Sequence, residues 1–221
     1  AVDEDVGPDD LGGLAVRQRK DLLRDRILAR IHERAKVSRE PVRILSVAAG
    51  PAQEVFELLN GYDLPDIPIQ FVLFDQDKQA LNLSQTRLLS VVRRRKLPNV
   101  NILCVHDSIK SFLKGQSTVG ERGPFDIVYT AGLFDYLRED LGTRLCSWFR
   151  GNLADDGLCY VGNFSTRNRS RWSMEHLYEW YLNHRTEDEL LRLADGDGGS
   201  RNARIEQEPS GLNLFLVFQR G

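Results

Sequence analysis

Residues 42–55 of the chain read VRILSVAAGPAQEV. The first six residues are a short apolar run rich in β-branched side chains, which predicts a buried strand. After this run come the small residues Ala48-Ala49-Gly50-Pro51-Ala52 and then a helix-like stretch, residues 53–59. Small side chains let the backbone of a tight strand-to-helix turn approach a ligand closely, and the helix beyond offers free N–H groups. Tight packing alone would also explain such a turn, so both interpretations stay open.

Strand-like and helix-like segments alternate along the rest of the chain. Further strands are predicted at residues 67–74, 100–105, 125–129, 157–163, 203–207 and 212–219. Further helices are predicted at residues 14–37, 77–94, 108–113, 136–149 and 174–193. Alternation with short connections is typical of an α/β protein, whose mostly parallel sheet is covered on both faces. The last two strands flank a Pro-Ser-Gly turn, which predicts a C-terminal antiparallel hairpin.

The composition is that of an ordinary globular protein. Of its 221 residues, 41% are hydrophobic and 28% charged, and the net charge is −2. This balance argues against global disorder and against nonspecific nucleic-acid binding. No apolar run approaches the roughly 20 residues needed to span a bilayer. We therefore expect one main domain, no nucleic-acid partner and no membrane span.

Residues 1–13 read as a disordered acidic lead-in without the basic and apolar regions of a secretory signal. The three cysteines are widely spaced and form no CxxC pair with which to hold a metal. We expect a reducing, cytoplasmic location and no metal site.

Ligands of open α/β sheets bind beyond the carboxyl ends of the strands. After the second strand come Asp75 and Gln76, and Asp75 lies 25 residues beyond Gly50. An acidic residue at about this spacing can accept hydrogen bonds from both hydroxyls of a ribose. Asp75 or Asp77 could instead cap the next helix, and Asp77 fits that role better. Asp75 is therefore the candidate for ribose binding.

The third and fourth strands end in further candidates. Asp107 and Ser108 follow the third strand, where either side chain could meet an exocyclic amine, and Ser108 could also cap the short helix. Thr130, Ala131 and Gly132 follow the fourth strand and could form the floor between a cofactor and a substrate.

These motifs, in this order, resemble the class I methyltransferases that use S-adenosylmethionine (SAM). The resemblance covers residues 42–219 and rests on ILSVAAGPAQEV, LFDQD, CVHDS, FDIVYTAGLFDYL, LADDGLCYVGNF and RIEQEPSGLNLFLVF. It implies a Rossmann-like seven-stranded methyltransferase fold in residues 41–221. It also implies that SAM is the cofactor, with its ribose at Asp75, its adenine beside Asp107 and Ser108, and its methionine portion along 48–52.

Two departures from the family pattern stand out. Many members have an acidic residue two places before the first glycine, and this chain has Ser46 there. The usual three glycines are reduced to Ala48, Gly50 and Ala52. A binding module that retained the fold but lost turnover is therefore one alternative, and a nicotinamide-dependent oxidoreductase is another. RNA methylation is disfavoured by the near-neutral charge.

A second, narrower resemblance concerns the acceptor. The stretch GNFSTRNRSRWSMEHLYEWYLNHRTEDELLRLA is similar to bacterial methyltransferases associated with hydroxy-fatty-acid methyl ester signals. It implies a small-molecule acceptor, with a fatty acyl carboxylate as the accepting group. A carboxylate needs no general base, so the absence of a catalytic triad is no objection. Substrate-binding candidates in and near this stretch are Tyr136, Asn163, Met174, Glu175 and Arg185. The aromatic residues of this stretch could equally be the packing face of a helix.

The first predicted helix precedes the glycine turn. We interpret residues 14–40 as a helical lid, from which Arg17 or Arg19 would reach the methionine carboxylate. The alternative is a helix that simply packs on the sheet with a solvated basic face. The oligomeric state stays open.

Overall fold

A single mixed sheet of seven strands runs through the computed structural model, which describes residues 11–195 and 202–220. The strand order is β3-β2-β1-β4-β5-β7-β6. The first five strands along the chain are parallel to one another, and β7 is antiparallel to both β5 and β6. The strands are β1 (Val42–Val47), β2 (Ile69–Asp75), β3 (Val100–His106), β4 (Phe125–Thr130), β5 (Leu153–Phe164), β6 (Arg204–Gln207) and β7 (Asn213–Gln219). The predicted mostly parallel sheet with a C-terminal antiparallel hairpin is confirmed.

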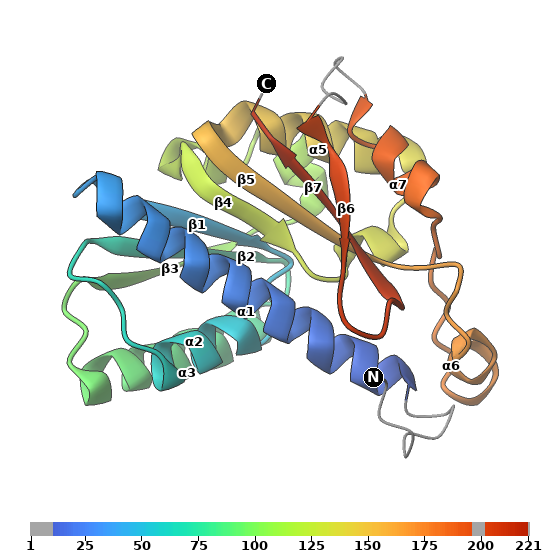
Figure 1. Ribbon diagram of the computed structural model, residues 1–221, viewed down its shortest axis with the longest axis horizontal. Coiled ribbons are helices and arrows are strands. Elements are labelled where there is room, and N and C mark those ends of the chain that lie inside the picture. Colours follow the sequence, from blue (N-terminus) through green and yellow to red (C-terminus); the bar gives the residue numbers. More distant parts are fainter. Residues whose placement is uncertain (1–10, 196–201, 221) are drawn as a thin grey trace.

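Helices cover both faces of this sheet (Figure 1). One face packs against α1 (Leu11–Val37), α2 (Gln53–Gly61) and α3 (Lys78–Arg95). The other packs against α4 (Ile109–Leu113), α5 (Glu139–Asn152) and α7 (Glu187–Arg192). The remaining short elements are η1 (Thr118–Arg122), η2 (Leu133–Tyr136) and α6 (Arg171–Leu177). Because both faces are covered, the central strands β1, β2 and β4 are almost fully buried and mostly apolar, as the sequence pattern predicted.

The order of the strands reverses at β1. From β1 the chain passes to β2 on one side, whereas β4 pairs with β1 on the other side. The loops that follow β1 and β4 therefore diverge at the carboxyl end of the sheet and leave a crevice between them. This crevice is where the fold provides room for a ligand.

Helix α1 closes one side of the crevice and is held by both apolar and ionic contacts. Leu23, Ile27 and Ile31 are at most 1% exposed and belong to the core beneath the sheet. Ion pairs then fasten the helix to its neighbours: Lys20–Glu57 on α2 (2.7 Å), Arg26–Glu206 on β6 (2.8 Å), Arg30–Asp156 on β5 (2.9 Å) and Arg34–Asp126 on β4 (2.9 Å). The helix thus packs on the sheet, as the alternative interpretation held, and its early turns also overhang the crevice.

Three predictions need correction. The helix predicted at 174–193 is two short helices, α6 and α7, joined by an extended segment that includes Glu179 with a φ of 51°. Residues 11–13 of the predicted disordered lead-in belong to α1, while residues 1–10 lie outside the described ranges. The helix predicted at 136–149 starts at Glu139, after the 3₁₀ turn η2. Among the described residues, no helix is both long and apolar enough to cross a membrane.

Candidate functional site

A cleft of 590 Å³ lies at the carboxyl ends of β1 and β4. One wall comes from α1, the floor from the loop after β1, and the far wall from the segment after β4. Its lining consists of Val16, Arg17, Arg19, Lys20, Ala48, Ala49, Gly50, Pro51, Ala52, Gln53, Glu54, Gln76, Ala131, Gly132, Leu133, Asp135, Tyr136 and Trp180. The structure therefore brings together the predicted turn, Gln76, two of the three candidates after β4, and both candidate arginines of the lid.

The loop after β1 adopts a glycine-like conformation at alternate residues. Ala48, Gly50 and Ala52 have φ values of 55°, 51° and 45°. The left-handed region costs a non-glycine residue about 1–2 kcal/mol, so the loop keeps the glycine geometry even where alanine replaces glycine. A side chain built on Gly50 would meet no protein atom within 4 Å, so the backbone there faces open space. The loop therefore leaves room for the close approach of a ligand to the backbone, which the small residues predicted.

Asp75 fastens this loop to the end of β2. Its two carboxylate oxygens accept hydrogen bonds from the N–H groups of Gly50 (2.7 Å) and Asp77 (2.8 Å), and the residue is 8% exposed. Asp75 does not itself line the cleft, whereas its neighbour Gln76 does. Asp77 caps α3 by accepting from Gln79 N–H (2.8 Å) and Ala80 N–H (3.1 Å), as predicted. Asp75 thus positions the loop, and its remaining lone pairs are what a ribose could use.

The candidates after β3 lie apart from the cleft lining. Asp107 accepts from the backbone N–H of Ser108 (2.7 Å) and the hydroxyl of Ser111 (3.1 Å). Ser108 caps α4 by accepting from the Ser111 N–H (3.1 Å). Both side chains therefore organise the turn into α4. Thr130 is fully buried at the end of β4 and likewise lies outside the lining.

Arg19 projects from α1 across the cleft. Its side chain is 15% exposed, and Nη1 lies 3.8 Å from the Asp135 carboxylate. Nη1 is buried and has no hydrogen-bond partner among the residues that the structure describes. The guanidinium lies over Gly132, where a Cβ would come within 3.2 Å of Nη1 and Nη2. Glycine at this position therefore makes room for Arg19.

Asp135 is a buried carboxyl group in the far wall. It is 2% exposed, and one of its oxygens accepts from the backbone N–H of Phe164 (2.7 Å). Burial raises the pKa of Asp135 to about 7, although the Phe164 N–H and the cations of Arg19 and Arg185 favour the charged form. This group therefore changes charge near neutral pH.

Glu54 is a cleft residue that the sequence reasoning missed. It sits in the first turn of α2, is 8% exposed, and accepts a hydrogen bond from the hydroxyl of Tyr129 (2.6 Å). Burial raises the pKa of Glu54, opposed by the bond from Tyr129 and the charge of Arg19. One sequence signal could have found it: Glu54 lies two places beyond the turn 48–52, in a chain that has Ser46 instead of an acidic residue before that turn.

The predicted acceptor residues fall into two groups. Tyr136 lines the cleft and accepts a hydrogen bond from the Trp180 indole N–H (2.7 Å), so these two rings form its rim. Met174 is buried in a small cluster at the start of α1, and Glu175 pairs with Arg171 (2.7 Å). Met174 and Glu175, both in α6, thus lie outside the cleft.

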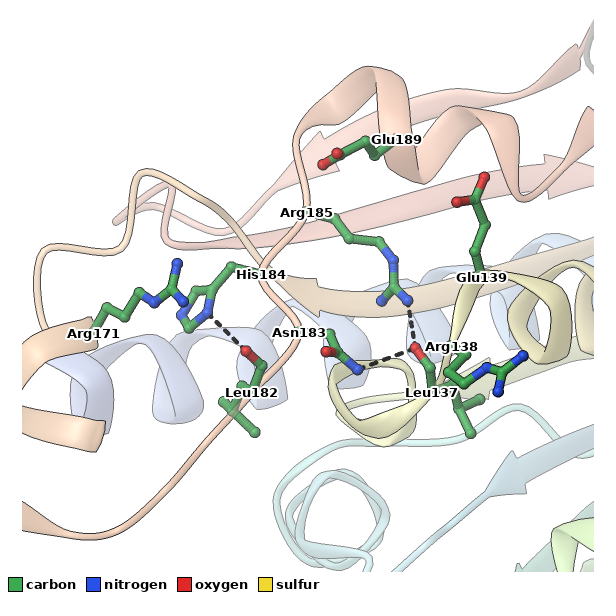
Figure 2. Close-up of a pocket in the computed structure, with 9 residues that line it drawn as sticks. All are labelled: Leu137, Arg138, Glu139, Arg171, Leu182, Asn183, His184, Arg185 and Glu189. Carbon is green, nitrogen blue, oxygen red and sulfur yellow. Dashed lines mark hydrogen bonds between the residues drawn. The ribbon is translucent and has the colours of Figure 1, made fainter. Parts of the chain in front are cut away.

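Asn163 and Arg185 are also placed away from the cleft. The Arg185 guanidinium donates to the carbonyl oxygens of Phe134 (2.7 Å) and Leu137 (2.5 Å) and to the side-chain oxygen of Asn163. Figure 2 shows Arg185 directed at the Leu137 carbonyl, which Asn183 also contacts. Arg185 and Asn163 therefore hold the far wall in place. Arg185 also borders a separate polar pocket of 410 Å³ between α5 and the segment that joins α6 to α7.

Comparison with solved structures identifies the fold. Its order of parallel strands with β7 inserted antiparallel beside β5 is the Rossmann-like methyltransferase fold. No protein-family profile and no curated protein sequence matches the chain.

Particular solved structures share the fold at low sequence identity. "A possible exported protein" from Bordetella parapertussis is similar with a TM-score of 0.69 and 16% identity over 94% of this chain and 68% of that one. The S-adenosylmethionine-dependent methyltransferase SibL is similar with a TM-score of 0.58 and 13% identity over 81% of this chain and 50% of SibL. An O-methyltransferase family 2 protein from Planctomyces limnophilus, in complex with apigenin, has a TM-score of 0.58 and 13% identity over 95% of this chain and 66% of that one. The chain thus spans only part of these proteins.

Proposed function

We propose that this chain is a SAM-dependent methyltransferase that acts on a small molecule. The proposal is carried by one arrangement: a glycine-like loop, a largely buried arginine and a buried glutamate line one cleft at the strand-order reversal of a methyltransferase fold. The open space at Gly50 fits a ligand with a polar, charged portion, and so does Nη1 of Arg19, which has no hydrogen-bond partner in the described part of the chain. The methionine portion would lie along 48–52, with Arg19 at its carboxylate, and the ribose would lie near Asp75 and Gln76.

The protein's part in such a reaction is positional. SAM when bound supplies a methyl group on a sulfonium, and transfer to an acceptor requires the two reacting atoms to be close and in line. Asp75 holds the loop beneath the ligand through Gly50. Tyr136 and Trp180 form a rim that would orient an apolar or flat acceptor. Asp135, with its pKa near 7, lines the same cleft, and a carboxylate acceptor would need no proton transfer from it.

We propose a fatty acyl carboxylate as the acceptor, which would give a methyl ester. Its support is the likeness of residues 162–194 to methyltransferases of hydroxy-fatty-acid methyl ester signals, together with the aromatic rim. A cytoplasmic location is part of the same proposal, supported by the free thiols of Cys104, Cys146 and Cys159. Asp107 and Ser108 remain candidates for the adenine side, reached from Gln76, whose carbonyl contacts the His106 ring (3.1 Å).

Thermal-shift titration separates the proposed class from its alternatives. The chain should be stabilised by SAM and by its product S-adenosylhomocysteine (SAH), whereas NADH should have no effect. Stabilisation by NADH alone would refute the methyltransferase assignment.

Labelled methyl transfer then tests turnover and acceptor. We expect product with long-chain fatty acids and none with their methyl esters, in which the carboxylate is already blocked. SAH binding without transfer to fatty acids, phenols or a cell extract would favour a non-catalytic binding module.

A further inference from the structure

Exposed apolar side chains are concentrated in α6 and in the segment that leads from α6 to the rim of the cleft. This segment ends at Trp180, whose indole N–H donates to the hydroxyl of Tyr136 on the opposite side of the rim (2.7 Å). The large hydrophobic side chains that are more than half exposed in the described part of the chain are Tyr136, Trp172, Leu177, Tyr178 and Tyr181 in this region, and Val37 and Leu83 elsewhere. Most of them therefore lie along one path to the cleft.

Positive charge accompanies these rings. Three exposed arginines precede or begin α6: Arg167, Arg169 and Arg171. Arg171 pairs with Glu175 (2.7 Å) and Arg167 pairs with Glu187 (3.4 Å), and in both pairs the arginine is more than half exposed. Exposed ion pairs contribute little, so these guanidinium groups can exchange their partners for another anion. Residues 165–181 contain three arginines and two glutamates, so this segment is cationic although the whole chain has a net charge of −2.

Buried contacts hold the segment to the body of the protein from its inner side. Met174 of α6 is buried in the small apolar cluster that contains Ala15 of α1 and Phe164 of β5. The amide of Asn168 donates to the sulfur of Met174 (3.2 Å) and closes the loop before the helix. Figure 1 shows α6 at one end of the molecule, beside the start of α1. The exposed side chains can therefore contact another surface while the inner side stays packed.

The interface of a lipid bilayer matches both features of this segment. Tryptophan and tyrosine rings, which have an apolar body and one polar edge, are favoured at the level of the lipid headgroups. Arginine binds phosphate through its planar fork of N–H groups, and anionic lipids attract clustered cations. A long-chain fatty acid, the proposed acceptor, also partitions into bilayers through its acyl chain. The surface and the substrate thus favour the same environment.

We infer that residues 167–181 dock the protein on a bilayer that contains anionic lipids, so that a fatty acid leaves the bilayer beside the rim of Tyr136 and Trp180. The rings supply the apolar contact, and the arginines supply the attraction to the headgroups. The transfer of the fatty acid rests on the proposed function, whereas the docking itself does not. We name residues 167–181 the docking segment.

Cosedimentation with vesicles tests the docking without any need for turnover. The wild-type chain should bind vesicles of phosphatidylcholine and phosphatidylglycerol in equal amounts, and bind phosphatidylcholine alone more weakly. Trp172→Ala and Leu177→Ala should each weaken binding by about 5- to 10-fold, and Arg169→Gln by about fivefold. The matched controls are Leu83→Ala and Arg93→Gln on α3, which Figure 1 shows apart from α6. Both controls replace exposed residues and should leave binding unchanged.

Quenching of tryptophan fluorescence by brominated lipid locates the contact. Trp172 is exposed, whereas Trp148 packs against the ring of Phe112 on the other face of the sheet (ring centroids 4.1 Å apart). Brominated acyl chains in the same vesicles should quench the wild-type chain. Trp172→Phe should lose most of this quenching, and Trp148→Phe should retain it. The conservative Trp172→Phe variant also keeps the test decisive if Trp172→Ala does not fold.

Several results would overturn the inference. One is a wild-type chain that binds SAH but does not sediment with the mixed vesicles. Another is a Leu83→Ala or Arg93→Gln variant that loses as much binding as the variants of the docking segment. Self-association that Trp172→Ala abolishes, without any binding to vesicles, would assign the segment to a second copy of the chain and refute docking on a bilayer. Vesicle binding with the expected variant pattern, by a chain that fails to bind SAH, would support the docking and refute the proposed function instead.

Discussion

Replacing Ala48 by glycine should stabilise the protein, although glycine usually destabilises. Ala48 has a φ of 55°, which costs an L-residue about 1–2 kcal/mol that glycine does not incur. Its methyl group is exposed, so little buried area is lost. The greater freedom of glycine in the unfolded chain offsets about 0.4–1 kcal/mol of the gain. The net expectation for Ala48→Gly is a rise of about 0.5–1 kcal/mol in the free energy of unfolding.

Two neighbouring alanines provide the controls. Ala52 also has a positive φ, but its methyl group is fully buried, and losing about 0.8 kcal/mol of burial should make Ala52→Gly nearly neutral. Ala49 is not among the residues with positive φ, so Ala49→Gly should destabilise by about 0.4–1 kcal/mol.

Urea denaturation and melting curves measure these differences. For a chain of this size, Ala48→Gly should raise Tm by about 1–4 °C. The reasoning is refuted if Ala48→Gly lowers stability as much as Ala49→Gly does.

Three further perturbations address the remaining parts of the site. Asp75→Ala removes the acceptor for the Gly50 and Asp77 N–H groups and should weaken SAH binding, measured by calorimetry, by on the order of 1–3 kcal/mol. An unchanged affinity would contradict the role of Asp75 in positioning the loop after β1. Gly162→Ala would put a Cβ 2.2 Å from the Ala131 carbonyl oxygen and should lower the free energy of unfolding, measured by urea denaturation, by about 3 kcal/mol. A variant as stable as wild type would show that the segment after β4 can shift to accommodate the methyl group. The pKa of Asp135 is about 7 in the folded protein and near 3.8 in the unfolded chain. Between these pH values the folded state holds a proton that the unfolded state has lost. The free energy of unfolding should therefore fall as pH rises from about 4 to about 7. Asp135→Asn retains the acceptor for Phe164 N–H and should flatten this slope, and an identical slope in both proteins would exclude Asp135 as its source.

Local sequence signals were sufficient for the sheet and for the loop after β1. The strand at 42–47, the small residues 48–52 and the cap at Asp77 each follow from residue type and spacing over fewer than ten positions. The helix ahead of the loop also gave Arg17 or Arg19 as a candidate, and both line the cleft. Such features depend on interactions close in sequence, which local pattern captures.

The segment 178–186 could not be predicted in this way. Its aromatic residues have helical spacing, yet the Asn183 N–H donates to the Asp135 carbonyl (2.7 Å) and the Arg185 guanidinium donates to the Phe134 carbonyl (2.7 Å). These long-range bonds hold the chain extended and override the local preference. Glu54 was missed for a related reason: its importance arises from Tyr129, which is 75 residues away in the sequence.

The ion pairs that attach α1 to the sheet make the attachment of this cleft wall sensitive to salt. The pairs Arg26–Glu206 and Arg30–Asp156 each include a side chain that is about half exposed, so they weaken as added electrolyte shortens the Debye length below its value of about 10 Å at 0.1 M. The apolar stripe of Leu23, Ile27 and Ile31 is insensitive to this screening. Higher ionic strength would therefore weaken the attachment of α1 at Arg26 and Arg30 while its apolar contacts persist, so one wall of the cleft responds to salt through contacts outside the cleft lining.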